Sequence, residues 1–143
     1  MIHGLDTGFL VAAELVEHAD HLAARGVLAR LIAAGDLIGI APQVLAEFIH
    51  VATDSRRFLK PLDMMTARRI AEQWWTAREV APMYPNDAAM RQFLAWLNQF
   101  HLGRKRLLDT LLAATYEEAG ITSLLTTNPS DFAVFGAFSC MAP

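Results

Sequence analysis

The sequence predicts an α/β fold with a central parallel sheet covered by helices on both faces, a three-layer α/β/α arrangement. Two observations support this prediction. Short apolar runs typical of buried strands alternate with longer segments of helical periodicity, and this alternation is typical of parallel sheets built from strand–helix–strand crossovers. The 143 residues are also 54% hydrophobic and only 19% charged. This is enough apolar material for the core of a single domain spanning residues 1–143.

The first half of the chain is expected to contain two strands and four helices. The opening strand ends at Asp6, and the chain then turns at once into a helix. Gly35 is placed to end a helix in the left-handed conformation, and Pro42 opens one at a first-turn position where its missing N–H does no harm. Asp63 is expected to cap the last of these helices. The predicted order is strand 2–5, helices 9–17 and 21–34, strand 37–41, and helices 42–53 and 64–78.

The second half continues the alternation. Segment 79–84 has the composition of a weak strand, but Pro82 favours an irregular segment instead. Asn86 or Asp87 is expected to cap a helix that ends near residue 101, and Gly120 is expected to end the next helix. The remaining predicted elements are helix 107–119, a β-branched strand at 121–126, a turn at 127–132 and a short strand at 138–141.

Four acids stand out in this pattern. Asp6 follows a strand, at the sheet edge where open α/β folds bind their ligands; it could equally be an ordinary helix cap. Glu47 and Asp109 lie near the starts of otherwise apolar helices, where an acid needs a cation or hydrogen-bond donors; a salt bridge would also satisfy each of them. Asp131 follows the 121–126 strand, where a turn or cap role is the alternative.

Together these acids predict a site made of oxygen ligands. Carboxylates without Cys or His suit Mg²⁺ or Mn²⁺. Divalent ions held in this way can activate water and stabilise both oxygens of an in-line phosphoryl displacement. The net charge of −3 indicates no general attraction to nucleic acid, yet it does not exclude a nuclease, because a cluster of metal-binding acids contributes negative charge itself.

Four ordered motifs resemble the PIN-domain ribonucleases, and among them the compact VapC-type toxins of bacterial toxin–antitoxin pairs. The resemblance covers essentially the whole chain in order and spacing. Each motif is weak alone, whereas the ordered set is fairly specific. The motifs are Leu5-Asp6-Thr7, Ala46-Glu47-Phe48, Leu108-Asp109-Thr110-Leu-Leu-Ala-Ala114 and Leu125-Thr126-Thr127-Asn128-Pro-Ser-Asp131-Phe132.

This resemblance implies a Mg²⁺-dependent endoribonuclease, with Mn²⁺ as a possible substitute. Asp6, Glu47 and Asp109 would be metal-binding acids, with Thr7 and Thr126 as supporting residues. The first polar position of the last motif holds Asn128 rather than Asp, so the fourth acid would be Asp131 and Asn128 a neutral ligand or positioning group. The resemblance further implies an RNA substrate, a homodimer and a cognate antitoxin protein.

Two basic groups lie close in sequence to the proposed site. One is Arg56 and Arg57, after the Glu47 helix; the other is Arg104, Lys105 and Arg106, just before the Asp109 helix. Side chains in such places can contact RNA phosphates and position the backbone without reading its sequence. The alternative is solvated loop charge.

Composition also bears on location. No apolar run approaches the roughly 18 residues of a membrane span, and the N-terminus lacks the basic leader of a signal peptide. The single cysteine, Cys140, fits a reducing compartment. We therefore expect a cytoplasmic protein without membrane association.

Two other classes of function remain as alternatives. A catalytically silent PIN-like module would bind RNA or protein without cutting, but intact Asp6, Glu47 and Asp109 speak against it. A phosphatase or receiver-like domain would use Asp6 as a phosphoryl acceptor; the neighbouring acid that such domains carry is absent, and no lysine follows Lys105. His18 and His21 are not expected to bind a metal as a pair, because the chain breaks the helix between them.

Overall fold

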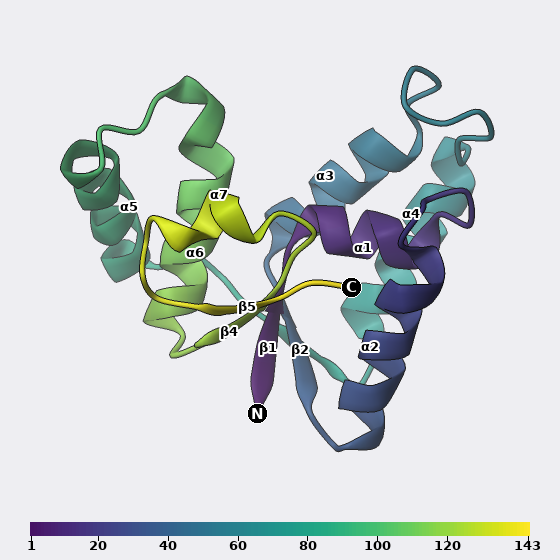
Figure 1. Ribbon diagram of the computed structural model, residues 1–143, viewed down its shortest axis with the longest axis horizontal. Helices are drawn as coiled ribbons and strands as arrows, with labels where there is room; N and C mark the ends of the chain where they lie inside the picture. Colours follow the sequence, from purple (N-terminus) through teal and green to yellow (C-terminus); the bar gives the residue numbers. More distant parts are fainter.

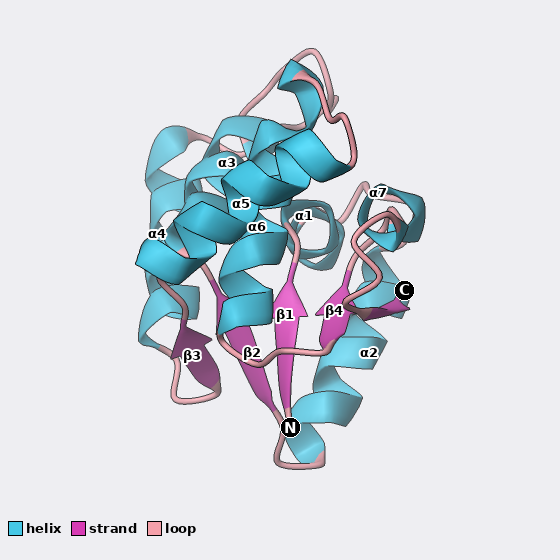
Figure 2. Cartoon of the chain, turned by 90° about the vertical axis from the view of Figure 1, so that its left-hand side faces the viewer, coloured by secondary structure: helices cyan, strands magenta, loops and turns pink.

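The computed structural model describes residues 1–143 and is built on a five-stranded sheet in the order β3-β2-β1-β4-β5. Every neighbouring pair of strands is parallel, and Figure 2 shows the first four strands side by side with their arrowheads pointing the same way. The predicted parallel α/β fold is thereby confirmed. The strands are β1 (Ile2–Leu5), β2 (Leu37–Ile40), β3 (Val80–Pro82), β4 (Ser123–Leu125) and β5 (Ser139–Met141).

Helices cover both faces of this sheet. Figure 1 shows α1 to α4 on one side of the strands and α5 to α7 on the other, as right-handed crossovers require when the chain first moves outward from β1 to β3 and then returns to β4. None of these helices is both long and apolar enough to cross a membrane. The helices are α1 (Thr7–Glu14), α2 (His21–Ala33), α3 (Pro42–Ala52), α4 (Met64–Thr76), α5 (Asp87–Gln99), α6 (Leu107–Glu118) and α7 (Pro129–Ala133), with a 3₁₀ turn, η1 (Arg104–Arg106), before α6.

Local signals at the helix ends act as the sequence predicts. The Asp63 carboxylate accepts a hydrogen bond from the Thr66 backbone N–H at 2.7 Å, and Asn86 caps α5 in the same way. Gly35 and Gly120 have φ values of 85° and 77°, so both take the left-handed conformation that ends a helix with little strain only at glycine.

Three segments differ from expectation. The first helix, expected at 9–17, spans Thr7–Glu14, because Asp6 caps it directly at the end of β1. Residues 80–82 form a true strand, although Pro82 favoured an irregular segment. Because β3 lies at the edge of the sheet, Pro82 can lack an N–H without leaving an acceptor of a central ladder unpaired. The expected turn at 127–132 contains the short helix α7, with Pro129 as its first residue.

A tyrosine that the sequence did not single out connects the ends of β1 and β2. Tyr116 on α6 is fully buried, and its hydroxyl donates to the Leu5 carbonyl at 2.7 Å and accepts from the Ala41 N–H at 3.4 Å. A Cβ atom on Gly4 would lie only 2.7 Å from the tyrosine ring. Glycine at this position therefore lets α6 pack tightly under the strand that leads to Asp6.

The strand order creates a crevice at the carboxyl edge of the sheet. The chain leaves β1 toward β2 on one side, whereas β4 lies on the other side of β1. Segments that follow β1 and β4 consequently diverge to opposite faces, and such switch points are where open α/β sheets bind ligands. Asp6 and Thr126 are the first residues after these two strands.

Candidate active site

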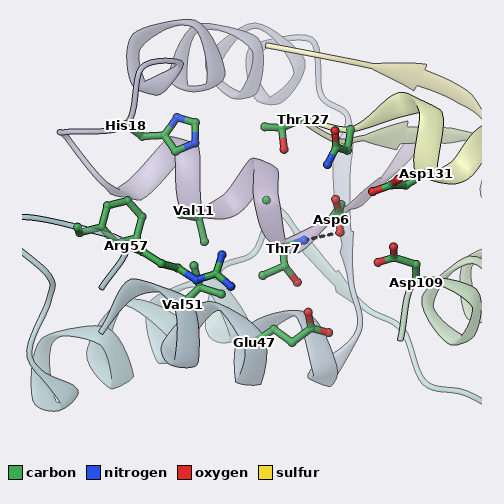
Figure 3. A pocket seen from close by; sticks show the side chains of 13 residues that line it. Asp6, Thr7, Val11, His18, Glu47, Val51, Arg57, Asp109, Thr127 and Asp131 are labelled. Carbon is green, nitrogen blue, oxygen red and sulfur yellow. Dashed lines mark hydrogen bonds between the residues drawn. The ribbon is translucent and has the colours of Figure 1, made fainter. Parts of the chain in front are cut away.

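A cavity of about 780 Å³ opens at this switch point. Figure 3 shows that side chains from the β1–α1 junction, from α3, from the start of α6 and from the segment after β4 point into it. The predicted acids Asp6, Glu47, Asp109 and Asp131 all line this cavity, as do Thr7 and Asn128. The fold thus brings to one place four acids that lie as much as 125 residues apart in sequence.

Asp6 is held by two hydrogen bonds at the centre of the junction. Its Oδ1 accepts from the Thr7 backbone N–H at 2.8 Å, and its Oδ2 accepts from the Thr126 hydroxyl at 2.9 Å. Thr126 is itself fixed, because its Oγ1 accepts from the Asn128 N–H at 3.0 Å. Asp6 therefore both caps α1 and faces the cavity, so the cap and the site are compatible roles for it.

The environment of Asp6 disfavours its negative charge. The pKa of Asp6 is raised from 3.8 to about 6, chiefly by burial and also by the Asp109 and Glu47 carboxylates, while the hydrogen bonds from Thr126 and Thr7 act in the opposite direction. Desolvation penalises an isolated carboxylate, and like charges nearby add to that penalty. A cation in the cavity would remove both penalties.

Glu47 approaches from α3, and its neighbour Gln43 connects this helix to the start of α6. The Gln43 amide, one turn earlier on α3, donates to the Leu108 carbonyl at 2.9 Å and lies 3.5 Å from a Glu47 carboxylate oxygen. Partial burial raises the pKa of Glu47, with a further contribution from the Asp109 carboxylate. Gln43 therefore links α3 to α6, the two helices that lie on opposite sides of the cavity.

Asp109 and Asp131 share the cationic neighbour Arg106. The Arg106 guanidinium donates to the Asp131 backbone carbonyl, and its Nε lies 3.8 Å from Asp109 Oδ2. This Nε is buried and has no hydrogen-bond partner. Burial raises the pKa of Asp109, and Asp131 adds to the shift while Arg106 opposes it. Arg106, expected to contact RNA, thus points inward to the acids.

Of the other basic residues that were predicted to contact RNA, one lies in the cavity and three lie outside it. Arg57 lines the cavity, whereas Arg56, Arg104 and Lys105 are exposed and not among its lining residues. The four acids line one cavity, but no three of them lie close enough together in this structure to hold a metal ion between them.

Several lining residues carried no functional signal in the sequence. His18 and Phe58 belong to segments that appeared to be ordinary connections, and Thr127, although part of the fourth motif, was given no role of its own. Gly8 is explained only by packing: a Cβ atom there would lie 2.6 Å from the Thr127 hydroxyl oxygen, so glycine allows α1 to approach the segment after β4. Contacts between segments more than a hundred residues apart give no local sequence pattern.

A carboxylate-lined cavity at the switch point of a parallel sheet defines the class: an α/β protein with a crevice at the place where open sheets bind ligands. The family is identified by sequence: the profile of the PIN domain matches residues 5–136, and the chain belongs to the PIN-domain family.

Relatives of known name agree with this assignment. Ribonuclease VapC43 of Mycobacterium tuberculosis and a VapC ribonuclease of Mycobacterium bovis are each 30% identical over 112 residues, which cover 78% of this chain and 74% of theirs. Among solved structures, the VapBC2 complex of Rickettsia felis bound to a promoter DNA fragment matches with a TM-score of 0.70 at 19% identity, covering 100% and 99% of the two chains. VapC20 of Mycobacterium tuberculosis, a toxin that cleaves the sarcin–ricin loop, matches with a TM-score of 0.65 at 21% identity and 87% coverage of both chains.

Proposed function

We propose that this chain is a Mg²⁺-dependent endoribonuclease that hydrolyses RNA phosphodiester bonds, and that it is the toxin of a toxin–antitoxin pair. The observation that supports this best is the convergence of Asp6, Glu47, Asp109 and Asp131 on one cavity at the switch point. The VapC ribonucleases among its relatives support the same activity.

The donor set fits a hard divalent cation. All four side chains offer carboxylate oxygens, and Mg²⁺ and Mn²⁺ prefer such ligands. The raised pKa values of Asp6, Glu47 and Asp109 describe carboxylates whose charge is poorly compensated, as expected for groups that bind a cation. We infer that Asp6, Glu47 and Asp109 would hold the metal, with Asp131 or Asn128 completing the set.

The residues of the chain then have distinct roles. Bound Mg²⁺ supplies a Lewis acid that lowers the pKa of water and stabilises charge on phosphate oxygens. Thr7 and Thr126 orient the Asp6 carboxylate through its two oxygens. Arg106 offsets part of the negative charge beside Asp109, which keeps the cluster compatible with a folded, metal-free state and helps admit an anionic strand.

Cleavage assays with matched variants test the proposal. Wild-type protein should cleave RNA in Mg²⁺ or Mn²⁺ and not in excess chelator, and Asp109→Asn should abolish cleavage while leaving the thermal unfolding transition cooperative. Asp87→Asn is the control, because this exposed acid lies on α5, outside the cavity. Cleavage that persists in chelator, or that is undiminished in folded Asp109→Asn, would contradict the metal mechanism. Absence of any cleavage by the wild type would favour the silent binding module.

The partner proposals need separate measurements. Solved structures similar to this chain include toxin–antitoxin complexes, and on this basis we propose that it binds a cognate antitoxin protein. We also propose a homodimer, as the resemblance to VapC-type toxins implies. Light scattering should give a mass about twice the 15.8 kDa of one chain. A short open reading frame beside the gene should encode an antitoxin protein that inhibits the cleavage. A monomer at micromolar concentration would contradict the dimer.

A further inference from the structure

The cavity extends well beyond the acids. Figure 3 shows Asp6, Asp109 and Asp131 together on one side and His18, Val11 and Arg57 on the other. A cavity of about 780 Å³ is in the range that holds an organic ligand, roughly 300–1,000 Å³, and is larger than a metal centre needs. The end opposite the acids is lined by Val11, His18, Val51, Arg57 and Phe58.

Arg57 is the cation of this second end. The loop that carries it is braced by Asp54, whose carbonyl accepts the Arg57 N–H at 3.1 Å and whose carboxylate lies 3.5 Å from the Arg57 Nε. The terminal guanidinium nitrogens make no hydrogen bond within the protein, and the side chain remains 60% exposed. Arg57 is therefore positioned by its stem and free to pair with an anion at its tip.

His18 supplies a planar ring on a rigid turn between α1 and α2. Its Nδ1 accepts a hydrogen bond from the Asp20 N–H at 3.1 Å, and its backbone N–H and carbonyl bond to Leu15 and His21 at 3.0 and 3.1 Å. The Nε2 atom has no partner within the chain. Phe58, half-buried beside Arg57 on the same cavity wall, adds a second aromatic ring.

We propose that this end of the cavity, the flanking subsite, binds the nucleotide adjacent to the cleaved bond of a single-stranded RNA. This inference rests on the proposed nuclease function. The scissile phosphate would lie at the acids, Arg57 would pair with the next phosphate, and the attached base would stack on His18 against the apolar wall of Val11, Val51 and Phe58. Proteins bind single strands by this combination of a cation for the backbone and aromatic rings for the bases.

The flanking subsite can be tested by binding, independently of cleavage. Affinity for a fluorescent single-stranded RNA octamer is measured by anisotropy in the Asp109→Asn background with Mg²⁺. Adding Arg57→Gln or His18→Ala should weaken binding roughly tenfold, and Arg57→Gln should reduce the log–log salt slope by about 0.7. His18→Phe, which keeps a ring, should retain most of the affinity.

Arg78→Gln is the matched control. This arginine is 93% exposed and is likewise paired with an adjacent carboxylate, at 2.9 Å. It lies just before the edge strand β3 and does not line the cavity, so the variant removes the same charge at a distant place.

In a second experiment, an abasic residue replaces each nucleotide of the octamer in turn. An abasic residue at one position beside the cleaved bond should weaken binding by Asp109→Asn protein that retains His18. The same protein with His18→Ala should be insensitive to that substitution, because the two changes remove the same contact.

The outcomes separate the subsite from the proposed function. If the wild type cleaves RNA but Arg57→Gln and His18→Ala bind RNA as tightly as Arg78→Gln does, the flanking subsite is overturned and the nuclease proposal stands. If no RNA is cleaved under any metal condition, the nuclease proposal fails, and the flanking subsite, which is defined by the cleaved bond, fails with it. Additive effects of the abasic residue and His18→Ala would overturn the stacking contact.

Discussion

Replacing Asp6 with asparagine is expected to stabilise the metal-free protein at neutral pH. Asparagine has nearly the same shape, can accept the Thr7 N–H bond at Oδ1, and caps a helix about as well as aspartate. It lacks the charge that burial and the neighbouring Asp109 and Glu47 carboxylates disfavour. The variant therefore removes an electrostatic penalty while keeping the local backbone geometry.

The magnitude follows from the pKa of Asp6. Its rise from 3.8 in an ordinary environment to about 6 in the folded protein means that ionising this carboxyl costs about 3 kcal/mol more in the native than in the unfolded state. Because the pKa of this acid is higher in the native state, the native state binds more protons than the unfolded state between pH 3.8 and about 6. The free energy of unfolding of the wild type therefore falls as the pH rises from about 4 to 6. Above that range the penalty stays constant.

Thermal and denaturant unfolding in chelator, at pH 4 to 8, measures this effect as the difference between the two proteins. The difference in free energy of unfolding should be small near pH 4 and should favour Asp6→Asn by about 2–3 kcal/mol above pH 6.5, equivalent to about 6–10 °C. The control variant Asp87→Asn should differ little from the wild type in free energy of unfolding, without the increase between pH 4 and 6.5 that is expected for Asp6→Asn. A difference for Asp6→Asn that is independent of pH, or a less stable variant at pH 7.5, would refute the reasoning.

Three further predictions follow from the same structure. Saturating Mn²⁺ or Mg²⁺, at one hundred times the dissociation constant, should stabilise the wild type by about 2.7 kcal/mol and Asp6→Asn by clearly less; equal shifts would remove Asp6 from the metal site. Gly4→Ala should destabilise the protein by about 1–3 kcal/mol in urea unfolding, because its Cβ would lie 2.7 Å from the buried Tyr116 ring. Neutralising Arg104 and Lys105 together should lower the log–log salt slope of RNA binding by about 1.4, and an unchanged slope would identify both as solvated charge only.

Local chemistry determined much of this protein. Glycine after a helix, proline at its first turn and a polar cap before it act within a few residues of themselves, so Gly35, Pro42 and Asp63 marked helix ends from the sequence alone. Alternation of strand-like and helical periodicity determined the α/β class in the same way. The acids could be nominated because a carboxylate in an apolar helix, or directly after a strand, requires a compensating partner.

The tertiary structure decided what those residues do together. Convergence of the acids depends on β4 pairing with β1 rather than with β3, a choice made by packing across the whole sheet. The same order places β3 at the edge, which allows Pro82 in a strand.

Side-chain direction was likewise decided by the tertiary structure. Arg106 points toward Asp109 while its neighbours Arg104 and Lys105 remain exposed, and His18 enters the cavity from a turn without any motif. The sequence by itself determined which chemical groups this protein carries and which elements hold them. The strand order determined which groups share a cavity, because contacts between residues distant in sequence form only when the elements pack.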